Sequence, residues 1–316
     1  MNDSRPAVDP KFFIVLNGGS GNQSVDATVT AIREGLTAAG RHFELAEAGP
    51  GELDAKAADM AGKARAADGV LVAAGGDGTL RSVAQLALDQ QLMFGVLPAG
   101  TFNFFGRSYG IPVEIAESVQ ALATAVERPV QVGIVNGRVF LVNASVGLYP
   151  ELIEDREAFK KRFGRTRFVA VCSAFATLFR DHRSLLLEFA QEGERRLLET
   201  STLFIGNSRL QLEKVGIEEA AVVRRGQLAA VIVKVLSRWG LARAAMRGAL
   251  GSLGEAEGVE SFSFVNLTVQ QRATSRRTVK VATDGEVVQL SFPLKFSVAS
   301  QPLRMLLPRR PVTVPA

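Results

Sequence analysis

Apolar and polar positions in the first third of the chain alternate between strand-like runs and helix-like spacing. The expected elements are strand Phe12–Leu16, helix Val25–Ala39, helix Leu53–Ala67, strand Gly69–Ala74, helix Leu80–Leu88 and strand Phe94–Leu97. Strands that alternate with helices pair in parallel and carry helices on both faces of the sheet. The pattern therefore predicts an α/β domain with a parallel sheet.

After about Val130 the pattern changes to short alternating strands. They are expected at Val130–Val135, Arg138–Val142, Ser184–Phe189, Ser201–Ile205, Gln227–Val235, Phe262–Val269, Thr278–Ala282 and Val287–Ser291. Turn pairs such as Asn136-Gly137 and Asp284-Gly285 separate several of them, and helical insertions are expected at Glu151–Arg180 and Trp239–Leu250. This part of the chain predicts an antiparallel β-domain, a sandwich, as a second domain.

Composition is that of a folded cytoplasmic protein. Of the 316 residues, 47% are hydrophobic and 22% charged, and the single cysteine, Cys172, excludes an intramolecular disulfide. The two histidines have no Cys or His neighbours at zinc-ligand spacing. The N-terminus has no signal-like pattern, and apolar runs such as Phe168–Phe179 are shorter than the roughly 20 residues that a spanning helix needs. We expect no membrane span.

The formal charge of +5 fits nucleic acid, an anionic membrane surface or a phosphate-bearing ligand. Arginines are scattered, and the chain has one Trp and two Tyr, too few for a surface that stacks bases. A nucleic-acid partner is therefore not expected.

The strongest chemical signal is a Gly-rich turn between strand Gly69–Ala74 and the next helix. It reads Gly75-Gly76-Asp77-Gly78-Thr79. Glycines let backbone N–H groups approach an anion, and the helix N-terminus adds the positive end of its dipole. Taken alone, the turn fits equally a tight connection in which Asp77 is a helix N-cap.

Two similar loops follow the neighbouring strands. The first reads Asn17-Gly18-Gly19-Ser20-Gly21, and the second, after strand Phe94–Leu97, contains Gly100, Thr101 and Asn103. In a parallel sheet these loops meet at the carboxyl edge of the strands, where ligands of open α/β sheets bind. Three such loops predict a cradle for a polyphosphate.

A fourth element, Asp284-Gly285-Glu286, lies far along the chain between two expected strands. Asp-Gly is a favoured hairpin turn, and alone this segment fits a solvated turn. Beside a phosphate cradle, a carboxylate can deprotonate an attacking hydroxyl, which typically contributes ~10²–10⁴-fold to the rate.

Together these motifs resemble the diacylglycerol kinase catalytic family of lipid kinases, which is related in fold to NAD kinase. The matching segments are Asn17–Gly21, Gly75–Thr79, Pro98–Arg107, Asn207 and Asp284–Glu286, with Pro302–Pro308 similar to the family's last strand. The resemblance implies an ATP-binding α/β domain of residues 1–129 with a returning segment at about 298–316. Residues 130–297 would form the lipid-substrate domain.

The resemblance also implies roles for the motif residues. The three Gly-rich loops would bind ATP, and Asp77 would lie by the nucleotide phosphates and their Mg²⁺. Glu286 would accept the proton of the lipid hydroxyl, with Asp284 supporting it or the metal. The family groups kinases of diacylglycerol, sphingoid bases and related lipids, so the acceptor lipid stays open.

Three positions depart from the family pattern. Its acidic residues are replaced by Phe104, Gln131 and Arg225. In bacterial members these acids belong to an accessory metal network, and a hard divalent cation requires oxygen ligands. We therefore predict that the accessory metal is absent, that the nucleotide's Mg²⁺ is the only metal, and that Arg225 supplies positive charge directly.

The membrane-facing part is expected in the two helical insertions. Glu151–Arg180 contains Arg156, Lys160, Lys161, Arg162, Arg165 and Arg167 ahead of the apolar Phe168–Phe179, and the second insertion carries Trp239, Arg243 and Arg247. Basic residues beside aromatics suit peripheral docking on an anionic bilayer, although apolar core with a solvated basic face fits equally. A homodimer is possible. Open alternatives are a kinase of a soluble substrate such as NAD and a nucleotide- or lipid-binding regulator that has lost turnover.

Overall fold

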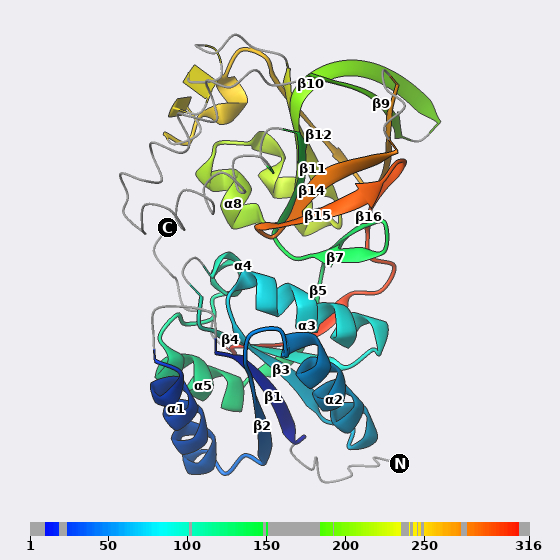
Figure 1. Cartoon of the computed structure of the whole chain (residues 1–316). Helices are drawn as coiled ribbons and strands as arrows, with labels where there is room; N and C mark the ends of the chain where they lie inside the picture. The colour runs from blue at the N-terminus through cyan, green and yellow to red at the C-terminus, as the bar shows by residue number, and fades with distance from the viewer. Residues whose placement is uncertain are drawn as a thin grey trace, which may run out of the picture. The chain divides into compact units, whose positions relative to one another are not determined.

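The structure is a computed structural model. It describes residues 10–18, 24–100, 103–147, 150, 184–191, 193–234, 240, 243–244, 246–247, 250–272 and 277–309. The chain forms two compact units (Figure 1): unit 1 runs to Val130 and resumes at Gln301, and unit 2 is Gln131–Ser300. The sequence-based boundaries, 129/130 and 297/298, lie within three residues of these positions.

Unit 1 is a six-stranded sheet with helices on both faces. Its elements are β1 (Phe12–Asn17), α1 (Val25–Ala38), β2 (Phe43–Ala48), α2 (Leu53–Ala66), β3 (Val70–Gly75), α3 (Asp77–Asp89), β4 (Met93–Pro98), α4 (Phe104–Ser108), α5 (Ile115–Ala123), β5 (Val126–Val130) and β17 (Leu303–Leu307). The strand order is β2-β1-β3-β4-β17-β5. All neighbours are parallel except β5, which is antiparallel to β17.

The helices of unit 1 bury one face each against the sheet. Ile32 and Leu36 of α1 pack with Val119 of α5 over one face, and α2 and α3 cover the other (Figure 1). Ser24 is the N-cap of α1, and its Oγ accepts the Ala27 N–H at 3.1 Å and so satisfies one free donor of the first turn. The strands β1, β3 and β4 are almost fully buried, as their continuous apolar runs predict for central parallel strands.

Unit 2 is mostly antiparallel sheet. Its strands are β6 (Gly133–Val135), β7 (Arg138–Phe140), β8 (Asn143–Gly147), β9 (Leu185–Gln191), β10 (Glu194–Gly206), β11 (Leu228–Lys234), β12 (Val259–Phe264), β13 (Asn266–Gln271), β14 (Thr278–Thr283), β15 (Glu286–Ser291) and β16 (Leu294–Val298). The helical elements described are α8 (Arg209–Lys214), η1 (Glu218–Arg225) and η2 (Leu253–Glu255).

The long strand β10 organises unit 2. Its first half pairs with β9, and its second half pairs with β8 and β11, with a register shift between Thr200 and Thr202. Side chains from many strands of unit 2, among them Phe140, Leu203, Phe264 and Phe296, form one buried apolar cluster. The fold class expected from the sequence, a parallel α/β domain and an antiparallel β-domain, is confirmed.

Several element boundaries predicted from the sequence were wrong. The strand expected at 130–135 is divided between β5 in unit 1 and β6 in unit 2, and the strand expected at 262–269 is divided into β12 and β13. The strands β2, β8 and β16 and the helix α5 were missed, and α3 begins at Asp77 rather than at Leu80.

The chain passes between the units twice, and the two passing segments pair with each other on both sides. In unit 1, Leu303 of β17 pairs with Val130 of β5, and in unit 2, Val298 of β16 pairs with Gly133 of β6. The Ala299 N–H also donates to the Val132 carbonyl at 3.0 Å. The strand β17 therefore belongs to the sheet of unit 1, although it follows all of unit 2 in the sequence.

Candidate active site

The three Gly-rich loops of unit 1 start from one edge of its sheet. The strands β1, β3 and β4 are parallel neighbours, and Gly75 pairs with Pro98 where β3 and β4 end. The Ala99 N–H donates to the Gly75 carbonyl at 2.9 Å, and Asn17 Nδ2 donates to Thr79 Oγ1 at 2.8 Å. The loops after the three strands are thus joined to one another by hydrogen bonds.

Glycines are required where the second and third loops touch. A Cβ added to Gly100 would lie 2.5 Å from Gly76 Cα, and one added to Gly75 would lie 2.7 Å from Thr79 Cβ. A Cβ on Gly78 would instead meet nothing within 4 Å. Gly78 lies in the first turn of α3, where backbone N–H groups have no intrahelical acceptor. The open space beside Gly78 and these N–H groups fit an anion. The close contact of Gly76 with Gly100 holds the two loops together there.

Asp77 ties the second loop to the third. It lies in the first turn of α3, but its carboxylate accepts the N–H groups of Phe104 and Phe105, both at 3.2 Å. Asp77 therefore caps α4, a helix about 27 residues further along, and does not cap its own helix, whose N-cap is Gly76. Burial raises the pKa of the Asp77 carboxyl above its ordinary value, and the two backbone hydrogen bonds oppose that shift.

Asn103 closes the third loop on itself. Its Oδ1 accepts the Gly100 N–H at 2.9 Å, and its Nδ2 donates to the Gly100 carbonyl at 3.0 Å. Asn103 is 5% exposed and has φ +50°, a left-handed conformation that Asn adopts more readily than most residues. The amide of Asn103 thus shapes the loop. Four residues predicted to bind ATP, Gly19, Ser20, Gly21 and Thr101, lie outside the described residues.

In unit 2, Asp284-Gly285 is the two-residue turn of the β14–β15 hairpin. Thr283 pairs with Glu286, and Asp284 and Gly285 have φ of +51° and +88°, as a type I′ turn requires. The Asp284 carboxylate is not left in solvent, because it accepts three consecutive backbone N–H groups. These belong to Leu141, Val142 and Asn143, at 2.7, 2.8 and 3.0 Å. Asp284 therefore anchors the turn.

Glu286 is the first residue of β15 and is exposed. Its place immediately after an anchored turn gives its backbone a fixed start. Asp77 belongs to unit 1 and Glu286 to unit 2. That the two carboxylates face each other across a cleft stays a prediction.

The three positions that depart from the family lie in two places. Phe104 begins α4 in unit 1 and gives its N–H to Asp77. In unit 2, Gln131 lies beside the turn after η1, since a Cβ on Gly226 would be 4.0 Å from Gln131 Oε1, and the adjoining Arg225 is exposed. Gln131 Nε2 donates to Asn207 Oδ1 at 2.8 Å and to the Gln227 carbonyl at 3.0 Å. Gln131 brings no negative charge to this place, unlike the acid that it replaces, and the absence of an accessory metal stays a prediction.

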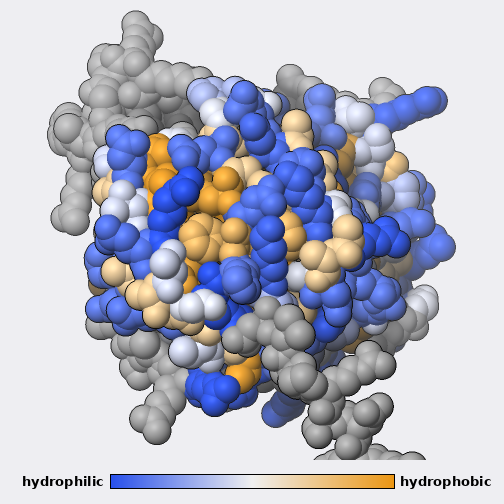
Figure 2. Space-filling model, turned by 90° about the horizontal axis from the view of Figure 1, so that it is seen from below, coloured by the Kyte–Doolittle hydropathy of each residue, from blue (hydrophilic) through white to orange (hydrophobic). Residues whose placement is uncertain are grey.

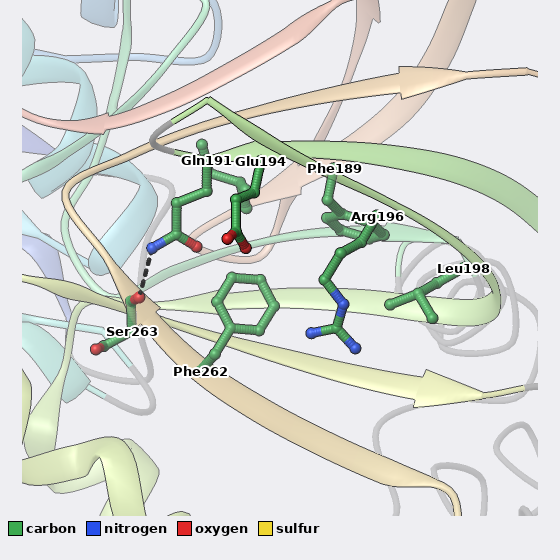
Figure 3. A pocket seen from close by; sticks show the side chains of 8 residues that line it. Phe189, Gln191, Glu194, Arg196, Leu198, Phe262 and Ser263 are labelled. Carbon is green, nitrogen blue, oxygen red and sulfur yellow. Dashed lines mark hydrogen bonds between the residues drawn. The ribbon is translucent and has the colours of Figure 1, made fainter.

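Unit 2 holds a cavity of about 290 Å³, whose lining side chains are shown in Figure 3. It is lined by Phe189, Gln191, Glu194, Arg196, Leu198, Phe262, Ser263 and Leu267. Gln191 Nε2 donates to the Ser263 carbonyl at 3.2 Å across it. Leu198 and Gly206 are eight residues apart in β10, or roughly 26 Å along an extended strand, and Gly206 pairs with Asn143 beside the turn. This cavity is not where an acceptor hydroxyl would meet Glu286.

The segments expected to dock on a membrane, Glu151–Arg180 and half of Trp239–Leu250, lie outside the described residues. Within the described part, the exposed large apolar side chains are Val113, Leu197, Met246, Leu250 and Val265. On the face shown in Figure 2, apolar side chains gather near the centre with polar ones around them. Among the described residues, no helix is both long and apolar enough to span a bilayer.

Comparisons with known proteins identify related kinases. The family model of the diacylglycerol kinase catalytic domain matches residues 11–135. A protein of Pseudomonas aeruginosa (strain UCBPP-PA14) named "Probable lipid kinase YegS-like" is 35% identical over 94% of each chain. The diacylglycerol kinase of Bacillus subtilis (strain 168) is 40% identical over 27% of this chain and 29% of its own.

A solved structure from Bacillus anthracis strain Sterne, described as a diacylglycerol kinase, superposes with a TM-score of 0.68 at 17% identity. It covers 97% of this chain and 98% of its own. At that identity it supports the fold.

The relatives are named as kinases of lipids, so the class of this protein is a phosphotransferase with an alcohol acceptor. The chain belongs to the diacylglycerol kinase catalytic-domain family and is similar along nearly its whole length to the YegS-like lipid kinase. The family resemblance and the enzyme class predicted from the sequence are confirmed.

Sequence reasoning missed several residues that hold the site together. The bond from Asn17 to Thr79, the capping of α4 by Asp77 and the three N–H groups that bind Asp284 all join positions far apart in the chain. No local pattern marks such pairs. Asn207 was noted only as a motif match, although its position directly after the buried end of β10 was a usable signal.

Proposed function

We propose that this chain transfers the γ-phosphate of ATP to a hydroxyl of diacylglycerol or a related lipid. The observation that carries the proposal is the joined set of loops in unit 1, in which Gly100 and Gly76 touch and Gly78 faces open space. Backbone N–H groups at the start of α3 suit a polyphosphate. The names of the relatives, a lipid kinase and a diacylglycerol kinase, support a lipid acceptor.

Each motif has a distinct task in this proposal. The loops at Asn17, Gly75–Thr79 and Gly100–Asn103 bind and orient the triphosphate, and Asp77 fixes the second loop against the third. Mg²⁺ bound with ATP neutralises charge that develops on the phosphoryl oxygens. Glu286 accepts the proton of the lipid hydroxyl, while Asp284 holds the turn that carries it. The proposal requires the Asp77 loop and the Glu286 hairpin to face each other across one cleft.

Peripheral contact with an anionic membrane belongs to the same proposal, because the acceptor is embedded in a bilayer. The formal charge of +5 supports such contact.

The decisive experiment is a kinase assay with labelled ATP against a panel of lipid micelles, with NAD as a soluble acceptor. Glu286→Ala is the control, and because Glu286 is exposed, its loss should leave the melting temperature unchanged. We expect phosphate transfer to a lipid and a drop of at least about 10²-fold in Glu286→Ala. Near-normal turnover in that variant would refute the role of Glu286. ATP binding with no transfer to any acceptor would refute the kinase proposal.

A further inference from the structure

The segment between β7 and β8 is buried but irregular. Leu141 and Val142 are each 2% exposed and belong to neither strand. Buried backbone groups outside a sheet need partners from elsewhere. The N–H groups of both residues donate to the Asp284 carboxylate, at 2.7 and 2.8 Å.

The carbonyl groups of the same two residues go to Asn207. Asn207 Nδ2 donates to the Leu141 carbonyl at 2.8 Å, and the Asn207 backbone N–H donates to the Val142 carbonyl at 2.8 Å. Asn207 is 3% exposed. One short piece of backbone is therefore bound by Asp284 through its donors and by Asn207 through its acceptors.

Gln131 in turn determines how Asn207 is oriented. Gln131 Nε2 donates to Asn207 Oδ1 at 2.8 Å, which leaves Asn207 Nδ2 to donate to Leu141 and, at 3.3 Å, to the Gln131 carbonyl. The same Gln131 nitrogen donates to the Gln227 carbonyl at 3.0 Å. Both partners of Gln131 Nε2 are acceptors, so the position requires a donor.

We propose that Gln131 and Asn207 are positioning residues for phosphoryl transfer, which set the Asp284 turn and hence the start of β15 at Glu286. This inference rests on the proposed function of Glu286. The path runs from Gln131 to Asn207, to the backbone at 141–142, to Asp284, and every step is a hydrogen bond of 2.7–2.8 Å.

The start of this path is also where the chain enters unit 2. Gln131 follows Val130, the last residue of β5, and its neighbour Val132 accepts the Ala299 N–H at 3.0 Å. The entry point of unit 2 and its catalytic hairpin are thus parts of one hydrogen-bonded network.

The first test is amide hydrogen exchange at residues 141–143 in Gln131→Leu, read by mass spectrometry on the folded full-length protein. Leu leaves two acceptors without their donor, so we expect exchange at these amides to be about tenfold faster or more. Gln91→Leu is the matched control, because it removes an exposed amide bond, Gln91 Nε2 to Gln301 Oε1 at 2.8 Å, in unit 1. Unchanged exchange in Gln131→Leu would overturn the network.

The second test uses Gln131→Glu. The new side chain has nearly the same size as the old one, so the variant is expected to fold. In this variant an ionised carboxylate would face two acceptors, whereas the protonated carboxyl can donate to Asn207 Oδ1. We expect its kcat to fall about tenfold at neutral pH, with KM for ATP unchanged, and to recover relative to the wild type as pH falls. A merely structural defect would not produce that pH profile.

The outcomes separate the two proposals. If the wild type phosphorylates no lipid, the proposed function fails, while the exchange result still decides the network. If exchange accelerates but kcat of both Gln131 variants equals that of the wild type, the network exists and the positioning role is wrong.

Discussion

At the scale of single residues, two of the three acidic residues of the motifs, Asp77 and Asp284, bind backbone groups that their sequence context did not indicate. Asp77 and Asp284 each accept backbone N–H groups from a segment distant in the chain. Of the alternatives drawn from the sequence, the hairpin turn at Asp284-Gly285 is present, whereas Asp77 is not the N-cap of its own helix, because Gly76 has that place and Asp77 binds the first N–H groups of α4. Their partners could not be predicted, because a carboxylate's long-range partner is determined by the tertiary fold.

The substitution Asp77→Asn tests the role of Asp77. Asn retains one acceptor and has no charge, so we expect a folded protein whose turnover is lost. Burial raises the pKa of Asp77 in the folded state above its value in the unfolded state. As pH rises through the acidic range to the folded-state pKa, the free energy of unfolding of the wild type therefore decreases. The melting temperature of the wild type minus that of Asp77→Asn should therefore fall over this range and be constant above it.

Melting curves between about pH 3.5 and 7 check this prediction, together with a kinase assay at neutral pH. Turnover in Asp77→Asn close to that of the wild type would contradict it, as would a difference in melting temperature that rises with pH.

At the scale of elements, the loops and the strands differ in how well the sequence predicted them. The Gly-rich loops were located correctly because their glycines are needed for close contact, such as that of Gly100 with Gly76. The edge strand β2 was missed because its sequence, Phe-Glu-Leu-Ala-Glu-Ala, is rich in helix-forming residues. The strand β8 was missed because Asn143–Gly147 is small and polar, although its neighbours in the sheet bury it.

A matched pair of glycine substitutions tests the loop contacts. In Gly100→Ala the new Cβ would lie 2.5 Å from backbone, so the loops must move apart, and we expect the protein to lose ~1–3 kcal/mol of stability. In Gly78→Ala the Cβ enters open space and alanine favours the helix, so stability should hold or rise by up to ~1 kcal/mol.

ATP affinity completes this comparison. Gly78→Ala should bind ATP at least several-fold more weakly although it is stable, because its methyl group occupies the space assigned to phosphate. Denaturant melts and ATP titration by calorimetry measure both effects. Equal stability of the two variants, or normal ATP affinity of Gly78→Ala, would count against the loop assignment.

At the scale of the whole molecule, the net charge bears on membrane binding, and the path of the chain between the two units bears on folding during synthesis. The chain carries +5 and pI ≈ 9.6. If it works on lipid in a bilayer, its binding to anionic vesicles should weaken as ionic strength rises, because salt screens charges over about 10 Å at 0.1 M.

Vesicle sedimentation at 50 and 500 mM salt measures this dependence, with vesicles of neutral lipid as the control. Binding that is equally strong at both salt concentrations, or equal on neutral vesicles, would exclude an electrostatic contribution.

The return of the chain to unit 1 has a consequence for biosynthesis. The strand β17 lies between β4 and β5, and its side chains Leu303 and Met305 are almost completely buried. A ribosome that has made residues 1–130 has therefore made a sheet with its fifth strand missing, and β5 has no partner in it. Unit 1 can complete its sheet only after all of unit 2 has been translated, so a stalled or truncated nascent chain should not release a fragment with a complete unit 1.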